Sequence, residues 1–281
     1  MIKTIGVCGA GTMGSGIAQV SAVAGYDTIL YDLDPNIVTI AKSTIEKSLS
    51  TLAEKKKITP ADQKAIWQRL TFTNNISACI AGLIIEAIVE KPEIKLDLFI
   101  NLAAHNNPGT ILASNTSSLS LDALAENIPG PERFAGMHFF NPAPVMKLVE
   151  VVRTKYTAAA TADTVMQVAR TMGKTPVLCN DSPGFIVNHV ARPYYLEALR
   201  LLEAGLSDKE TIDSLMESTG FRMGPFRLMD LIGNDINYAV SQSVYESLGK
   251  PERLKPSSIQ RRMVEEGNLG RKTGKGYYPY E

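Results

Sequence analysis

The sequence predicts a mostly parallel α/β domain in its N-terminal part, followed by an all-α domain. Three observations support this prediction. A glycine turn directly follows an apolar strand near the N-terminus, strand-like and helix-like segments alternate up to about residue 180, and no convincing strand follows. We place the boundary near Ser182 and expect domains at residues 1–182 and 183–281. A chain of 281 residues with 44% hydrophobic content suits two such domains.

The composition excludes several classes of partner. Lys plus Arg and Asp plus Glu are equal at 29 each, so no overall charge favours nucleic acid or an anionic membrane. Three scattered cysteines, Cys8, Cys79 and Cys179, are too few for a disulfide framework or a metal site. They favour a reducing compartment, and we expect a cytoplasmic protein without metal. We expect no signal peptide, and the apolar run near Ala78–Ile85 is too short to span a bilayer.

The N-terminal segment has the pattern strand, glycine turn, helix, strand, acid. The apolar run Lys3–Cys8 enters the turn Gly9-Ala10-Gly11-Thr12-Met13-Gly14, and the second strand, Thr28–Tyr31, ends on Asp32. Glycines allow a tight turn and close approach to a pyrophosphate, whose charge a helix N-terminus favours. Asp32 can accept ribose hydroxyls and would repel a 2′-phosphate. The pattern therefore predicts a Rossmann-type domain that binds NAD rather than NADP, with FAD as the minor alternative.

The next part of the chain has a helical pattern from Ile37 to Leu70. The pattern breaks near Thr59, and Pro60 fits the first turn of a second helix that Thr59 caps. Three lysines, Lys55–Lys57, end the first of these helices. They form either a solvated helix end that compensates the helix dipole or a phosphate-binding patch.

Alternating structure then resumes, with polar side chains after two of the strands. We expect strands at Thr71–Thr73, Leu83–Ile88 and Thr110–Ala113, and a helix from about Pro92 to Ala104. Glu90 and the polar cluster 114–118 follow strands, and ligands of parallel sheets bind beyond the carboxyl ends of strands. The cluster is therefore a candidate binding loop. Its alternative role is to cap a helix at Leu119–Ala125.

The segment from Phe134 to Glu150 is the candidate catalytic region. It has the pattern of a strand, a proline turn and a second strand. If the strands pair antiparallel about Pro144, His138 and Glu150 lie opposite each other, with Cβ atoms ~5 Å apart. A histidine oriented by a carboxylate can serve as general acid and base. The alternative is a histidine that is simply buried in the core.

The remaining chain is predicted to be mainly helical. A helix at Ala160–Met172 and a strand at Thr175–Cys179 complete the first domain. Asp181 or Ser182 would then cap a helix with Pro183 in its first turn. The predicted helices of the second domain are Phe185–Glu203, Asp208–Ser218, Leu228–Leu248 and Ser257–Glu266. Long apolar helices in so small a domain favour a homodimer.

Several motifs together resemble the NAD-dependent 3-hydroxyacyl-CoA dehydrogenase family. They are the turn Gly9–Gly14, Ser114–Leu119, His138–Glu150, Pro183–Asn188, Met223-Gly-Pro and Gly270–Gly276. The chain length is similar to that of bacterial stand-alone 3-hydroxybutyryl-CoA dehydrogenases. In the second half, Ala191–Arg200 and Met223–Tyr238 also resemble 3-hydroxyadipyl-CoA dehydrogenases. The family normally has arginine where this chain has His189.

The resemblance implies a role for individual residues. His138 would be the catalytic acid and base, Glu150 its partner, and Ser117 and Asn188 would bind the 3-oxygen of the substrate. The implied cofactor residues are Gly9, Gly11, Thr12, Met13, Gly14, Asp32, Glu90, Lys95, Asn115, Ser117, Asn141 and Lys272. On the CoA side the resemblance implies Ser48, Lys55 and Ser117, which favours the phosphate-binding interpretation of the lysines at 55–57.

The acyl chain and one alternative class of function stay open. The resemblance favours a short acyl chain, with 3-hydroxybutyryl-CoA as the expected substrate and 3-hydroxyadipyl-CoA as the alternative. Arg192, Arg222 and Arg227 are candidates to pair with the far carboxylate of an adipyl group, or else form ordinary ion pairs. A non-catalytic NAD(H)-binding protein is the alternative from a different class.

Overall fold

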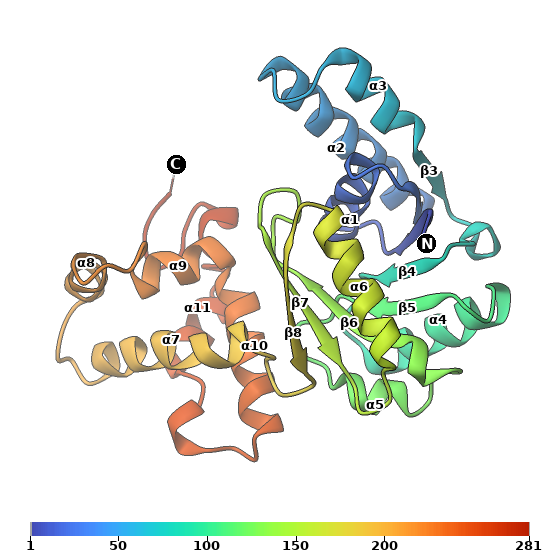
Figure 1. The fold of residues 1–281 in the computed structure, drawn as a ribbon. Helices are drawn as coiled ribbons and strands as arrows, with labels where there is room; N and C mark the ends of the chain where they lie inside the picture. The colour runs from blue at the N-terminus through green and yellow to red at the C-terminus, as the bar shows by residue number, and fades with distance from the viewer. Residues whose placement is uncertain (1, 281) are drawn as a thin grey trace. The chain divides into compact units, whose positions relative to one another are not determined.

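The computed structural model describes residues 2–280 and divides into two compact units between Asp181 and Ser182. Figure 1 draws the first unit in blue to yellow and the second in yellow to red. The end residues of the predicted domain ranges, 1 and 281, lie outside the described residues. Each unit has its own set of elements and its own buried cluster, and they are described separately here.

The first unit is built on an eight-stranded sheet with the order β3-β2-β1-β4-β5-β6-β7-β8. All neighbouring strands are parallel except β6 and β7. The predicted mostly parallel sheet is therefore confirmed. The strands are β1 Thr4–Cys8, β2 Asp27–Tyr31, β3 Leu70–Thr73, β4 Leu83–Glu86, β5 Ile111–Ser114, β6 Phe134–Phe139, β7 Leu148–Arg153 and β8 Thr175–Asn180.

Helices of the first unit pack on this sheet, and side chains from α1, α2 and α6 join those of the strands in one buried cluster. Strand β1 is buried along almost its whole length, as expected of a parallel strand covered on both faces. The helices are α1 Thr12–Val23, α2 Pro35–Glu54, α3 Pro60–Gln68, α4 Pro92–His105, α5 Leu121–Ala125 and α6 Ala159–Thr171.

The strand register gathers several of the predicted site residues of this unit at one edge of the sheet. Cys8 pairs with Glu86, and Glu86 pairs with Ser114, so the carboxyl ends of β1, β4 and β5 lie side by side. Ser114 in turn pairs with Gly136, which places His138 two residues further toward the same edge. The glycine turn, the loop after β4 and the loop after β5 all leave from this edge.

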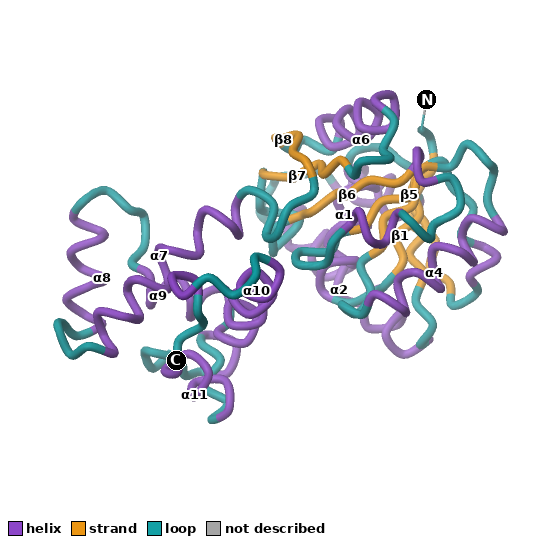
Figure 2. The backbone as a smooth tube through the Cα atoms, turned by 90° about the horizontal axis from the view of Figure 1, so that it is seen from below, coloured by secondary structure: helices purple, strands orange, loops and turns teal. Residues whose placement is uncertain are grey.

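The second unit is helical, and the bounds of two of its helices correct the sequence prediction. Figure 2 shows helices joined by loops, and among its described residues the β structure is limited to isolated bridges between 270 and 279. The helix predicted from Pro183 begins at Val187, because Pro183 and Gly184 lie in a turn and Phe185 has a φ of 50°. The helices are α7 Val187–Glu203, α8 Lys209–Ser218, α9 Pro225–Ile232, α10 Asn234–Ser247 and α11 Ser258–Glu265.

The segment predicted to be helical at about Leu228–Leu248 contains two helices separated by Gly233. Gly233 has a φ of 104°, which no helix accommodates, so α9 ends before it and α10 begins after it. Asn234, the first residue of α10, donates its backbone N–H to the carbonyl oxygen of Leu269 at 3.1 Å. The break therefore joins α10 to the C-terminal part of the unit.

The C-terminal segment of the second unit closes around Asp230, which is 1% exposed. A Cβ at Gly276 would lie 1.9 Å from Asp230 Oδ1, and one at Gly270 would lie 2.2 Å from the Asp230 carbonyl oxygen. The two outer glycines of the segment 270–276 are thus required by packing. The Asp230 carboxylate accepts hydrogen bonds of 2.9 Å from Asn234 Nδ2, the N–H groups of Tyr277 and Tyr278, and the Tyr280 hydroxyl.

Candidate active site

The three glycines of the N-terminal turn have different structural roles. Gly9 has a φ of 101°, and a Cβ there would lie 2.5 Å from the Ala87 carbonyl oxygen. A Cβ at Gly14 would lie 1.7 Å from the Gly9 carbonyl oxygen, so Gly14 allows α1 to begin against the turn. Around an added Cβ at Gly11, nothing lies within 4 Å. Gly11 thus leaves open the approach to the N-terminus of α1, and these residues fit a dinucleotide pyrophosphate.

Asp32 follows β2 and supports the same turn. Its Oδ2 accepts a hydrogen bond from the Ala10 N–H at 2.7 Å, and its Oδ1 accepts one from the Asp34 N–H at 3.1 Å. A carboxylate has about four lone-pair positions, so capacity remains for the hydroxyls of a ribose. The carboxylate beside the turn favours NAD over NADP, because it would repel a 2′-phosphate.

The predicted pairing of His138 with Glu150 is confirmed. The two residues are direct partners in the antiparallel ladder of β6 and β7. His138 Nδ1 lies 2.7 Å from Glu150 Oε2, and the two residues are 6% and 1% exposed. The Phe140 ring lies against the imidazole, with 4.6 Å between ring centroids. A buried carboxylate bonded to Nδ1 orients the ring and stabilises its protonated form.

Lys95 of α4 bridges two carboxylates. It is 1% exposed, and its Nζ lies 2.5 Å from Glu86 Oε1 and 3.1 Å from Glu90 Oε2. Glu86 is fully buried on β4 and also accepts hydrogen bonds from the Ser114 hydroxyl and the Ile88 N–H. Burial raises the pKa of Glu86, although Lys95 and these donors oppose the shift. Lys95 thus holds both Glu86 and Glu90 at this edge of the sheet.

Glu90 in turn organises the loop after β5. Its Oε1 accepts hydrogen bonds from the Thr116 hydroxyl, from the Ser118 hydroxyl at 2.9 Å and from the Ser117 N–H at 3.2 Å. Burial would raise the pKa of Glu90, but Lys95 and the hydroxyl donors outweigh it and lower the pKa. Within residues 2–280 the half-buried Ser117 hydroxyl makes no hydrogen bond. The loop therefore presents this hydroxyl while its neighbours are engaged.

The capping role considered for the cluster 114–118 is wrong. Helix α5 begins at Leu121, and its cap is Ser120, whose side chain accepts a hydrogen bond from the Ala123 N–H. The cluster is instead engaged with Glu86 and Glu90. Asn115 has a different role, since its Oδ1 accepts a hydrogen bond from the Phe139 N–H at 2.8 Å and so links the loop to β6.

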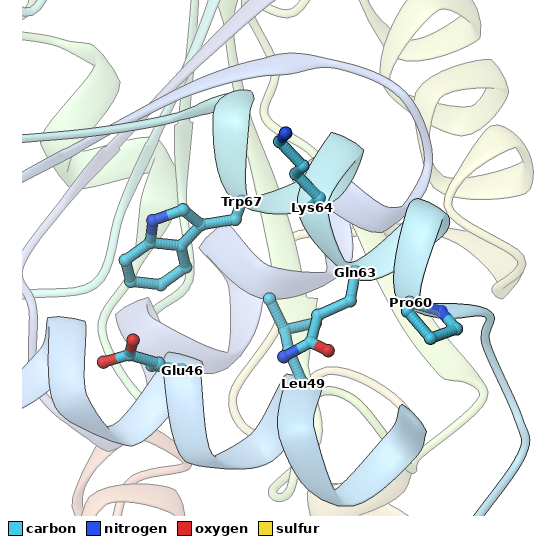
Figure 3. Close-up of a pocket in the computed structure, with 6 residues that line it drawn as sticks. All are labelled: Glu46, Leu49, Pro60, Gln63, Lys64 and Trp67. Atoms are coloured by element: carbon cyan, nitrogen blue, oxygen red, sulfur yellow. The ribbon is translucent and has the colours of Figure 1, made fainter. Parts of the chain in front are cut away.

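Of the residues expected on the CoA side, Ser48 lies on α2, Lys55 directly follows its last residue, and Ser117 lies in the loop after β5. Ser48 and Lys55 are seven residues apart, about two helical turns, so they lie on the same face. The helix ends at Glu54, and Lys56 has a φ of 54°, so the three lysines form the exposed end of α2. Thr59 caps α3 as predicted. Figure 3 shows a pocket between α2 and α3 lined by Glu46, Leu49, Pro60, Gln63, Lys64 and Trp67.

Three further predicted residues have these surroundings. Asn141 is exposed in the turn between β6 and β7. In the second unit, Asn188 lies in the first turn of α7, and its side chain makes no hydrogen bond to residues 2–280, while its carbonyl oxygen accepts one from Arg192 Nε. Lys272 forms an ion pair with Asp235 at 2.6 Å.

The sequence prediction missed Glu86, and it included Thr116 and Ser118 only as members of the cluster 114–118. Glu86 ends a strand that is otherwise apolar, and a carboxylate in a buried strand is itself a signal of a polar network. The sequence alone does not show that Glu90 accepts hydrogen bonds from the hydroxyls of Thr116 and Ser118 rather than from that of Ser117.

Two further observations concern membrane-spanning helices and metal-binding clusters. Among residues 2–280, no helix is both long and apolar enough to cross a membrane. The same residues contain no group of three or more His, Cys, Asp and Glu side chains that could hold a metal ion.

Comparison with known proteins gives consistent matches. Residues 4–182 match the model of the 3-hydroxyacyl-CoA dehydrogenase NAD binding domain, and residues 184–280 match that of the 3-hydroxyacyl-CoA dehydrogenase C-terminal domain. The chain is 45% identical to the 3-hydroxyadipyl-CoA dehydrogenase of Escherichia coli over 281 residues. That match covers 99% of this chain and 59% of the relative.

Two other similar proteins have nearly the same length as this chain. A probable 3-hydroxybutyryl-CoA dehydrogenase of Deinococcus radiodurans is 43% identical over 277 residues, covering 98% of this chain and 99% of the relative. The crystal structure of an (S)-3-hydroxybutyryl-CoA dehydrogenase from Ralstonia eutropha has a TM-score of 0.95 and 37% identity, with both chains covered fully.

Proposed function

Because this chain belongs to the 3-hydroxyacyl-CoA dehydrogenase family, we propose that it interconverts a (3S)-3-hydroxyacyl-CoA and the corresponding 3-oxoacyl-CoA with NAD. The observation that carries the proposal is the buried His138–Glu150 hydrogen bond at the sheet edge that also bears the glycine turn. An acid/base pair beside a dinucleotide site suits the removal of a hydride and a proton from a secondary alcohol.

His138 is proposed to move the proton of the reaction. Glu150 holds Nδ1, so Nε2 is the ring nitrogen that would exchange a proton with the substrate 3-hydroxyl. Bound NAD supplies hydride transfer at its nicotinamide. In oxidation His138 takes the hydroxyl proton, and the imidazolium that forms is stabilised by Glu150. In reduction the same imidazolium protonates the 3-oxygen.

Ser117 is proposed to donate a hydrogen bond to the 3-oxygen, where negative charge develops. Glu90 already accepts hydrogen bonds from the neighbouring Thr116 and Ser118 hydroxyls, which supports this role for the Ser117 hydroxyl. A donor aimed at a developing oxyanion stabilises the transition state more than the ground state. The assignment of Asn188 to the same oxygen, and of Lys272, Ser48 and Lys55 to the cofactor and CoA, rests on the family resemblance.

For the acyl chain, we propose a short substrate, 3-hydroxybutyryl-CoA, with 3-hydroxyadipyl-CoA as the alternative. Of the three candidate arginines, Arg227 already lies 3.4 Å from Glu217 Oε1. Arg192 is 2% exposed, and its guanidinium donates to Asn188, Asn237 and Ser241. Neither is available to an adipyl carboxylate without rearrangement, which leaves the exposed Arg222 as the candidate.

The chain-length proposal predicts a higher kcat/KM for acetoacetyl-CoA than for 3-oxoadipyl-CoA, measured as NADH oxidation. The buried Arg192 guanidinium already donates to other oxygens, so it has little hydrogen-bonding capacity left for an adipyl carboxylate. A preference for 3-oxoadipyl-CoA that Arg222→Ala removes would reverse the assignment. If no 3-oxoacyl-CoA is reduced while NADH binds tightly, the non-catalytic NAD(H)-binding alternative replaces the dehydrogenase.

We also propose a homodimer formed through the second unit, in the cytoplasm, with a place in fatty-acid β-oxidation. Free cysteines and the absence of a membrane-spanning helix among residues 2–280 are compatible with that location. The support for a dimer is a set of exposed large apolar side chains on the second unit, Val190, Leu206, Leu215, Phe221, Leu231 and Ile236.

The dimer proposal predicts that light scattering gives twice the 30.5 kDa chain mass. Charges introduced at Leu206 and Leu215 would lower that mass if either residue lies in the interface, because burying an unpaired charge is costly. A concentration-independent monomer for the unmodified protein would contradict the proposal.

A further inference from the structure

Lys174 is a buried lysine that the proposed mechanism does not use. It is 8% exposed, and its ammonium donates hydrogen bonds to the Ala143 carbonyl oxygen at 2.5 Å and the Met146 carbonyl oxygen at 2.8 Å. Among the described residues it forms no ion pair with a carboxylate. Burial and the like charge of Lys147 both lower the pKa of Lys174. Burying an ammonium group without a carboxylate partner costs free energy. We therefore ask what its two hydrogen bonds contribute.

The backbone of Lys174 is fixed from both sides. Helix α6 ends in a Schellman motif, in which Gly173, with a φ of 70°, donates to Arg170 and Lys174 donates to Ala169. The next residue, Thr175, begins β8 and donates its N–H to the Lys147 carbonyl oxygen at 2.8 Å. The side chain of Lys174 therefore starts from a rigid position beside the end of the turn between β6 and β7.

That turn, residues 140–147, is held between Lys174 and α1. The N–H groups of residues 145 and 146 both bond to the Pro142 carbonyl oxygen at 2.9 Å. Ala143 is 2% exposed, and a Cβ added at Gly16 of α1 would lie only 3.1 Å from the Ala143 Cβ. The helix that begins at the glycine turn thus packs directly on one side of the 140–147 turn, while Lys174 bonds its carbonyl groups.

The 140–147 turn carries residues that bear on the candidate chemistry. The Phe140 ring contacts the His138 imidazole, and Asn141 is the residue that the resemblance assigns to the cofactor. A shift of this turn would move both. Misplacing a group beside a reacting centre by 1 Å can lower the rate about 100-fold, which far exceeds the effect of an ordinary surface change.

We propose that Lys174 is a positioning residue, whose ammonium holds the Ala143 and Met146 carbonyl groups so that the 140–147 turn keeps Phe140 on His138 and Asn141 toward the cofactor. The proposal rests on the proposed function, since it assigns Lys174 to the dehydrogenase reaction. Lys174 acts through the turn and is not itself a catalytic residue. Without the ammonium, two carbonyl oxygens at the turn would lose their hydrogen bonds.

The test compares Lys174→Met, which keeps the length of the side chain and removes its donors, with Lys174→Arg, which keeps both charge and donors. The matched control is Lys147→Met, which removes the neighbouring exposed lysine without touching the turn's carbonyl bonds. For NADH and acetoacetyl-CoA we expect Lys174→Met to lower kcat about tenfold or more, with the KM for acetoacetyl-CoA within about twofold. Lys174→Arg should retain kcat within about threefold, and Lys147→Met should match the unmodified protein.

Three outcomes would overturn the proposal. They are an unchanged kcat in Lys174→Met, equal losses in Lys174→Met and Lys174→Arg, or a loss of kcat that merely follows the fraction of folded protein seen by circular dichroism. If Lys174→Met does not fold, Gly16→Ala presses on the turn from the opposite side and should lower kcat in the same way. A normal kcat there would equally overturn it. Failure of the proposed function is distinct, because the unmodified protein would then be inactive.

Discussion

Replacing His138 with glutamine should lower kcat by roughly 10²–10⁴-fold, the usual contribution of a general acid and base. Glutamine keeps much of the side-chain volume but cannot carry the proton between the 3-oxygen and the Glu150-bound ring. Because the glycine turn is untouched, NADH should bind with nearly the same Kd, measured by its fluorescence. A kcat close to that of the unmodified protein would remove His138 from the mechanism.

The matched change for this prediction is Glu150→Gln. It leaves the imidazole in place and removes the charge that stabilises its protonated form, so kcat should fall by less than in His138→Gln. An identical loss in both variants would indicate that the two residues act as one unit.

A comparison of Gly14→Ala with Gly11→Ala should distinguish an effect on the stability of the turn from an effect on cofactor binding. A Cβ at Gly14 would lie 1.7 Å from a backbone oxygen, so Gly14→Ala should reduce the free energy of unfolding by ~1–3 kcal/mol and weaken NADH binding as well. Gly11→Ala meets nothing within 4 Å, so stability should change by less than about 0.5 kcal/mol. Its methyl group would stand where the pyrophosphate approaches, so NADH binding should still weaken about tenfold or more.

Thermal unfolding and NADH titration of both variants check this prediction. A destabilised Gly11→Ala protein would show that the turn is crowded at this position after all. Unchanged NADH binding in Gly11→Ala would place the pyrophosphate away from the turn and would weaken the dinucleotide assignment.

The register of β6 and β7 could be predicted because it depends on local chain geometry. Two strands joined by a short turn pair symmetrically about its centre, so counting from Pro144 places His138 opposite Glu150. The glycine turn could be predicted for a similar reason, since strand, turn and helix are contiguous in sequence. Each of these features arises within one short contiguous stretch of the chain.

The parts that could not be predicted depend on contacts between distant segments or on single backbone angles. Glycine is often tolerated within a helix, so Gly233 did not reveal that it adopts a φ of 104° and separates α9 from α10. The burial of Lys95 between Glu86 and Glu90 requires α4 to pack against the end of β4. Likewise, Lys174 meets carbonyl groups some thirty residues earlier in the chain, a contact that no local pattern encodes.

The packing around Asp230 limits which amino-acid substitutions this part of the chain can accept. Gly270 and Gly276 leave no room for a Cβ beside Asp230, and the same carboxylate bonds the N–H groups that follow Gly276. Substitution at any one of the three positions changes what the other two must accommodate, so their effects are not additive. A substitution at Asp230, Gly270 or Gly276 is therefore expected to persist among related sequences only together with a compensating substitution at another of the three positions.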